Sequence, residues 1–267
     1  MTRDLHKWLA TIRVNWTKHL TWKLNLLLMV IGPAVIFYVV KINLWQSIFE
    51  FNELEVFQGY TLGKMLSYQL WVLVVSMLAQ GYNSMNLAED IRLGRISAYL
   101  IYPFSFANFH LAGFFAFQGV QIIVAGLTLA IALTSALMPM PELLDLGKGF
   151  FISMLVGLVW FQISFVIGLG AFWLEETWVL RVMFLNIASL LSGSILPLEV
   201  FPEWLQQGLM YTPFPWLTWF PAKVFMGEAE ASVVTAALVL LFWYGVFRYI
   251  SHLIWSRGLQ LYTAAGM

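Results

Sequence analysis

Six long apolar runs constrain this chain more than any other feature of its sequence. They cover Leu24–Val40, Leu62–Ala88, Phe104–Leu137, Gly149–Leu174, Val182–Leu198 and Ala231–Ile250. A membrane-spanning helix needs roughly 20 consecutive apolar residues, and most of these runs supply them. Hydrophobic residues make up 61% of the chain and charged residues only 10%, as is typical of an integral membrane protein. The sequence therefore predicts an all-α integral membrane fold with six transmembrane helices.

The charges between these runs predict the orientation of the chain. The N-terminus, residues 89–103, residues 175–181 and the C-terminus carry ten Lys or Arg and five Asp or Glu. The opposite connections carry four Lys (Lys41, Lys64, Lys148 and Lys223) against nine acids. Because basic loops stay in the cytoplasm, both termini are expected there. A seven-span alternative would count Trp204–Ala222 as a helix, but it would place Arg248 and Arg257 outside, so six spans are favoured.

Ser192–Gly227 interrupts the apolar pattern before the last run. Prolines disfavour a continuous helix, yet Trp204–Ala222 holds six aromatic residues and no charge, which a solvated loop would not. Broken apolar backbone is tolerated at membrane depth where other protein covers it. We expect a re-entrant or interfacial helical segment at residues 199–222, on the external face. Its marker residues are Pro197, Pro202, Trp204, Pro213, Pro215, Trp216 and Pro221.

Residues 1–23 form an amphipathic pattern ahead of the first run. Their apolar positions recur at helical spacing, and the remaining face is basic. This pattern predicts an interfacial helix on an anionic leaflet of the lipid bilayer, and the plainer alternative is a basic juxtamembrane segment. The transmembrane domain is then residues 24–258, followed by a cytoplasmic tail at 259–267.

The cytoplasmic stretch EDIRLGRISAYLIYPFS, residues 89–105, combines charged and apolar residues. Acidic residues suit the start of a helix, and a proline ends it before the third span. We expect one short helix at 89–103 that another protein could engage, with a plain connecting turn as the alternative. The residues that mark it are Glu89, Asp90, Arg92, Gly94, Arg95 and Pro103.

Polar residues form mild stripes within three of the runs. In the third run the stripe consists of Gln118, Gln121 and Thr128. Those in the second and fifth runs could line a polar substrate path, or could equally form hydrogen bonds between packed helices. The candidate path residues are Gln69, Gln80, Asn83, Asn186, Ser189 and Gly193.

Several classes of function find no support in the sequence. It contains no cysteine, no histidine pair at metal-ligand spacing and no phosphate-binding loop, so no metal site, catalytic residue or cofactor is expected in this chain. A formal net charge of zero argues against a nucleic-acid partner. The apolar runs also lack a central carboxylate or lysine, which ion-coupled carriers usually keep. Uphill transport would therefore need energy from another subunit.

The order of these features resembles an ABC type-2 permease. The resemblance is carried by E-D-I-R-L-G-R-I…Y-P-F-S between the second and third runs, and by S-G…L-P-L…F-P-E-W…P-F-P-W…P-A-K…G before the last. It implies a bacterial inner-membrane exporter with two permease chains, identical or homologous, and two separate ATPase chains that bind ATP and Mg²⁺. It also implies that residues 89–103 are the coupling helix and that the second and fifth spans line the path at the dimer axis. A non-transporting anchor or sensor subunit that recruits an ATPase is the alternative.

Overall fold

The computed structural model describes residues 2–21, 23–80, 85–101, 104–134 and 141–261. Within these ranges the chain forms helices and turns and no strand, so the predicted all-α fold is confirmed. The longer helices are α1 (Thr2–Thr21), α2 (Lys23–Phe51), α3 (Leu62–Ala79), α6 (Phe106–Thr134), α7 (Leu143–Leu169), α8 (Trp178–Leu191) and α12 (Val233–Leu261). The shorter ones are α4 (Met85–Arg92), α5 (Ile96–Ile101), α9 (Glu203–Leu209), α10 (Phe214–Leu217) and α11 (Trp219–Phe225).

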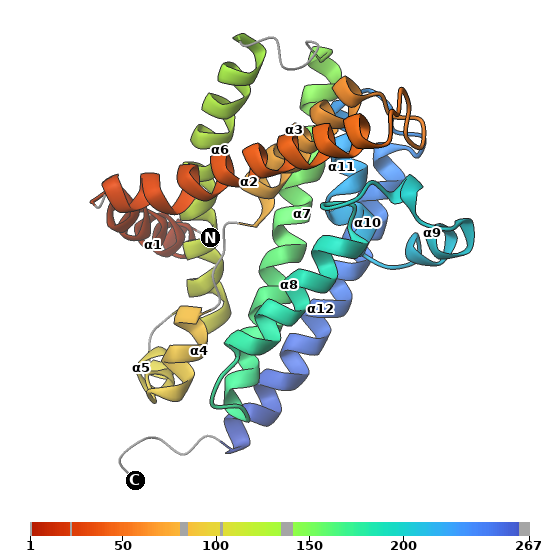
Figure 1. Ribbon diagram of the computed structural model, residues 1–267. Coiled ribbons are helices and arrows are strands. Elements are labelled where there is room, and N and C mark those ends of the chain that lie inside the picture. Colours follow the sequence, from red (N-terminus) through yellow and green to blue (C-terminus); the bar gives the residue numbers. More distant parts are fainter. Residues whose placement is uncertain (1, 22, 81–84, 102–103, 135–140, 262–267) are drawn as a thin grey trace.

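Four helical stretches in the described part are long and apolar enough to cross a membrane: Leu62–Ala79, Phe106–Leu133, Leu143–Phe172 and Val233–Leu261. They correspond to the second, third, fourth and sixth predicted spans. The fifth predicted span is α8, which has only 14 residues and is about 21 Å long. The first falls within α2, which crosses the upright helices obliquely in Figure 1.

Helix α7 is the centre of the bundle. It packs along α12 and also contacts α3 and α11, while α6 packs on α3 (Figure 1). Much of α3 is buried, as expected for a helix surrounded by its own chain. Rings of Trp71 in α3 and Phe225 in α11 stack at a centroid distance of 4.4 Å, which ties the short C-terminal helices to the core.

Helix α1 lies against α6. Its Trp8 ring meets Phe104 edge-on at 5.3 Å, and its Trp16 ring covers Gly119 so closely that a Cβ there would lie 2.1 Å from the indole. Ile12 is half-buried on the same helix, whereas Leu9 is 55% exposed. The apolar face of α1 is thus used partly within the chain, and its role at a membrane surface stays a prediction.

One of the lysines assigned to an external connection lies elsewhere. Lys41 is inside α2, which continues to Phe51, and its side chain is buried. The assignment of Lys41 to a loop was therefore wrong. Lysine is a good helix former, and the buried ammonium group of Lys41 finds acceptors at Gln69 and Ser194.

The two ends of the bundle carry different connections. Helices α4 and α5, the α7–α8 connection and the end of α12 lie at the lower end in Figure 1, while α11 lies toward the upper end. The sequence predicts the first set on the cytoplasmic side. These segments share one end of the bundle, and which side of the membrane that end faces stays a prediction.

Candidate functional site

The segment predicted as one helix at 89–103 is two short helices, so that prediction was wrong in detail. Helix α4 ends at Arg92, the chain turns, and α5 begins at Ile96. Gly94 sits in the turn with φ of 71°, a left-handed conformation that glycine adopts without steric cost. The turn is closed by a hydrogen bond from the Arg95 N–H to the Asp90 carbonyl at 2.9 Å. Pro103 lies outside the described residues.

Asp90 is the buried centre of this helix pair. Its carboxylate accepts hydrogen bonds from Arg95 Nη1 at 3.1 Å and from the Tyr99 hydroxyl at 3.0 Å. His110 Nε2 of α6 lies 3.9 Å from the same carboxylate. Arg95 also pairs with Glu89 at 3.0 Å. The charged residues that we singled out here therefore hold α4 and α5 together.

Arg92 links the α4–α5 pair to the α7–α8 connection. Its Nη1 donates to the Glu175 carbonyl at 2.9 Å and to the Glu176 carboxylate at 2.6 Å. Two apolar residues of the pair remain outside these contacts, because Leu93 is 53% and Ile101 is 81% exposed. Neither of these two residues was singled out from the sequence.

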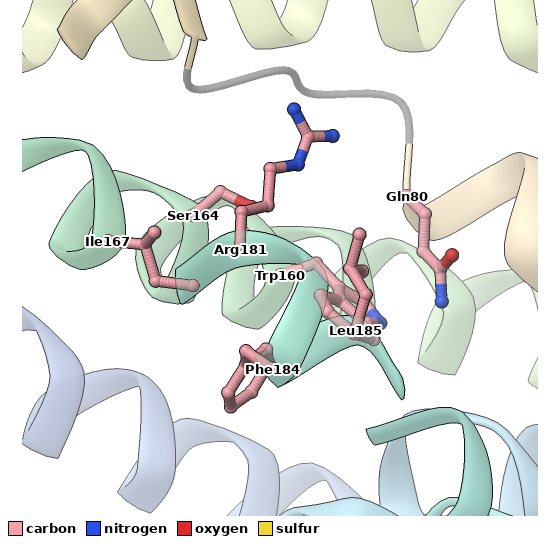
Figure 2. A pocket seen from close by; sticks show the side chains of 7 residues that line it. All are labelled: Gln80, Trp160, Ser164, Ile167, Arg181, Phe184 and Leu185. Atoms are coloured by element: carbon pink, nitrogen blue, oxygen red, sulfur yellow. The ribbon is translucent and has the colours of Figure 1, made fainter. Parts of the chain in front are cut away.

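A small pocket of about 80 Å³ lies between the end of α3, the second half of α7 and the start of α8. Figure 2 shows Ser164 and Ile167 at one side of this pocket, Gln80 at the other, and the Arg181 side chain reaching between them. The remaining lining residues are Trp160, Phe184 and Leu185. We call this space the α3–α7–α8 pocket.

The candidate path residues fall into different environments. Gln80 lines the α3–α7–α8 pocket, and Asn186 is exposed on α8. The Ser189 hydroxyl donates to the Leu185 carbonyl of its own helix. Gln69 and Gly193 are buried near the end of α8, and Asn83 lies outside the described residues. The structure therefore brings Gln80 together with α8 but separates it from Gln69.

The proline-rich segment folds into the short helices α9, α10 and α11. Pro197, Pro202 and Pro213 each stand just before a helical turn, where a missing N–H costs nothing. Pro215 and Pro221 lie within the first three residues of α10 and α11 for the same reason. Trp204 is 73% exposed on α9, whereas Trp216 is buried and donates to the Met210 carbonyl at 3.0 Å.

An ionic cluster that sequence reasoning missed joins this segment to the start of α3. Lys223 Nζ lies 3.0 Å from Glu199 and 3.2 Å from Glu228, and Lys64 pairs with Glu228 at 3.0 Å. The Tyr60 hydroxyl donates to Glu199 at 3.1 Å. Burial, and then the negative charge of Glu199, raise the pKa of Tyr60 well above its ordinary value, so the hydroxyl stays protonated and remains a donor.

Buried polar contacts also hold the end of α8. Lys41 Nζ donates to Gln69 Oε1 at 2.5 Å and to the Ser194 carbonyl. The Tyr68 hydroxyl donates to the Gly193 carbonyl at 2.7 Å, and the Trp219 N–H donates to the Ser192 carbonyl at 2.9 Å. These contacts join α2, α3 and α11 at the point where α8 stops.

Comparison with curated proteins and with solved structures gave no significant match. A family model described as ABC-2 family transporter protein matches residues 35–266. The match includes the α4–α5 pair, the α3–α7–α8 pocket and the proline-rich segment, and it leaves α1 outside. Together with the all-helical membrane fold, this match over most of the chain shows that the protein belongs to the ABC-2 transporter family.

Proposed function

We propose that this chain is the permease subunit of an ATP-driven exporter in the bacterial inner membrane, with six spans and both termini in the cytoplasm. The two further spans would be α2 and α8. No nucleotide-binding motif occurs in the sequence, so ATP and Mg²⁺ would bind to a partner ATPase and this chain would not itself be an enzyme. The observation that carries the proposal is the family match over residues 35–266.

The α4–α5 pair is the proposed docking site for the ATPase. It stands at one end of the bundle (Figure 1), and its internal ion pairs hold it as a unit against α6 and the α7–α8 connection. Ile101 and Leu93 offer apolar contacts on this unit. Because ion pairs hold α4 and α5 together, a movement of the docked ATPase would be passed through the pair to α7 and α8.

A second permease chain, identical or homologous, would cover the outer side of α8. Met183, Ile187 and Leu190 are 56%, 50% and 42% exposed, and their spacing places them on one face. Helix α3 is mostly buried within its own chain, so α8 would supply most of this contact. The resemblance implied that the second and fifth spans, α3 and α8, both face the dimer axis. We propose that the contact is made mostly by α8.

The docking proposal is tested with two matched substitutions at opposite ends of the bundle. Ile101 and Leu143 are 81% and 85% exposed, so a change of either to Asp disturbs little packing. The tagged chain is purified with its companions, and the ATPase activity that it stimulates is measured. We expect Ile101→Asp to reduce ATPase recovery and stimulation by at least tenfold, and Leu143→Asp to leave both unchanged. Equal behaviour of the two variants would remove α4–α5 as the docking site.

Transport is separated from mere recruitment of an ATPase by a second measurement. Gln80→Leu and Asn186→Leu alter residues of the proposed path without touching the α4–α5 pair. We expect loss of export from cells while the ATPase still purifies with the permease. Unchanged export in both variants would favour the anchor or sensor function.

A further inference from the structure

We propose that Arg248 and His252 of α12 bind the headgroup of an anionic phospholipid, near the α4–α5 end of the bundle. The site lies on the outside of α12, where lipid surrounds a membrane-spanning helix. This inference needs α12 to cross the membrane, as its length and composition allow. It does not depend on a partner ATPase or on the direction of transport.

One face of α12 is left uncovered by the described part of the chain. The residues that α12 buries are Ala236, Leu240, Ser251 and Gly258, and the helix packs chiefly along α7. Residues three or four apart on a helix share a face. Four exposed residues at this spacing make up the uncovered face near the α4–α5 end, which we call the Arg248 face: Gly245, Arg248, Tyr249 and His252.

Arg248 lies inside the hydrocarbon core of the membrane. Tryptophan prefers the membrane interface, and Trp173 is 49% exposed at the α7–α8 connection. The neighbouring Phe172 ring meets Trp255 of α12 at a centroid distance of 5.8 Å, so Trp255 marks the same level on α12. From Val233 to Trp255 the helix rises about 33 Å, which matches a hydrocarbon core of about 30 Å. Arg248 is then about 10 Å inside the interface.

A guanidinium at this depth needs an anionic partner. A charge that faces hydrocarbon is costly, and arginine lowers the cost by reaching toward lipid headgroups or by drawing them inward. In the part of the chain that the structure describes, Arg248 belongs to no ion pair, and neither does His252. The described protein supplies no counter-ion there, whereas a lipid phosphate can.

The polar side chains of the Arg248 face match a phosphate group. The guanidinium of Arg248 can donate two parallel hydrogen bonds to two phosphate oxygens. His252, one turn nearer the interface, has an N–H donor in either protonation state, and Tyr249 adds a hydroxyl. Gly245 leaves room beside them, because no atom lies within 4 Å of a Cβ placed there.

A lipid with net negative charge fits this face better than a zwitterionic one. Residues 233–261 contain no aspartate or glutamate, so the ammonium group of a zwitterionic headgroup would find no anion on α12. Leu241 and Leu238, 51% and 64% exposed, continue the face toward the middle of the helix and suit the acyl chains. A lipid bound in this way would hold α12 at a fixed depth beside α7.

The test uses a single thiol, because the chain contains no cysteine. Gly245→Cys places the thiol one turn from Arg248, and Leu238→Cys, two turns further along the same face, is the matched control position. Each full-length variant is labelled with a bimane fluorophore and reconstituted in vesicles of phosphatidylcholine and phosphatidylglycerol. One of the two lipids at a time carries dibrominated acyl chains, which quench the fluorophore on contact. We expect about fivefold preference for phosphatidylglycerol at position 245 and none at position 238.

Substitutions in the Gly245→Cys chain identify the cause of the preference. Arg248→Gln should abolish it, and Arg248→Lys should retain most of it because the charge is kept. Arg257→Gln is the control, since Arg257 is also an exposed arginine of α12 but lies on a different side of the helix, and it should keep the full preference.

Three results would overturn the site. The first is equal quenching by the two lipids at position 245, or a preference that survives Arg248→Gln. The second is loss of the preference in Arg248→Gln and Arg257→Gln alike, which would show a general effect of charge. The third is no quenching by either lipid, which would mean that protein, such as a second permease chain, covers the face. Because neither export nor ATPase activity is measured, these failures differ from a failure of the proposed function.

Discussion

Two short helical units stand outside the long helices, and they are attached to the bundle in different ways. The outer unit, residues 192–228, contributes Trp216, Leu217 and Phe220 to the same core as α7 and α12. The inner unit, α4 with α5, contributes Leu87, Ile91 and Ile96 to a smaller cluster at the opposite end. Ion pairs of Arg95 hold its turn, and an ion pair of Arg92 joins it to Glu176; the side chains of Arg95 and Arg92 are 51% and 41% exposed.

The difference indicates which unit can move. Apolar burial and close packing fix the outer unit to the bundle, because any displacement opens a cavity. Half-exposed ion pairs contribute little each and are weakened by salt. The inner unit also buries Leu87 and Ile96, so a displacement would break its ion pairs first, whereas the outer unit has more buried apolar contact to lose. The predictions below test this contrast.

The largest effect is expected from Gly193→Ala in the outer unit. Gly193 has φ of 82°, and a Cβ there would lie 2.7 Å from Trp219 Cβ and 2.8 Å from the Tyr68 hydroxyl. Backbone strain and overpacking together should lower the free energy of unfolding by about 3 kcal/mol. Denaturation in mixed micelles measures it. Gly208→Ala is the control, because no atom lies within 4 Å of its added Cβ; similar losses in both variants would show that the outer unit is not tightly packed.

The next largest loss of stability is expected from Lys223→Met. The Lys223 side chain is only 10% exposed, and its removal leaves Glu199 and Glu228 without their shared cation. Since both carboxylates are about one-third exposed, we expect a loss of about 2 kcal/mol, below that of a fully buried pair. Thermal unfolding measures it. The further change Glu199→Gln should recover part of the loss, and no recovery would argue against the ion pair as its cause.

A smaller effect is expected from Asp90→Asn in the inner unit. The buried carboxylate accepts from Arg95 and Tyr99, and the amide keeps only part of these bonds. We expect about 1 kcal/mol less protection of residues 85–101 in hydrogen exchange. Glu89→Gln, at a more exposed carboxylate, should change this protection little. Loss of protection in the outer unit as well would break the contrast between the two units.

The smallest effect is expected from Arg92→Gln. Its ion pair with Glu176 is exposed, with side chains at 41% and 65%, so stability should fall by about 0.5 kcal/mol or less. Hydrogen exchange of residues 173–177 measures the loosening, which should resemble that of the unaltered chain in high salt. A loss above about 2 kcal/mol would mean that the inner unit is as firmly fixed as the outer one.

The sequence was sufficient to predict the all-helical membrane fold, the interrupted segment and the family, because each depends on local pattern. Apolar runs and prolines determine the backbone conformation of residues that are close to them in the sequence. The position of Lys41 could not be predicted, since its acceptors at Gln69 and Ser194 are 28 and 153 residues away. Likewise, nothing local to Asp90 indicates that Tyr99 and His110 would surround it. The polar stripes were ambiguous for the same reason: Gln69 is used inside the chain, while Gln80 lines a pocket.

The length of α8 has a consequence for how cargo would leave. At about 21 Å, α8 is shorter than a bilayer core of about 30 Å, and Gly193 turns the chain immediately beyond it. In the proposed orientation, the backbone that follows α8 would cover the remaining third of the membrane core. This backbone is held by contacts with α2, α3 and α11. If the proposed function is right, a substrate that moved along α8 would meet this backbone and would leave sideways, into the outer leaflet.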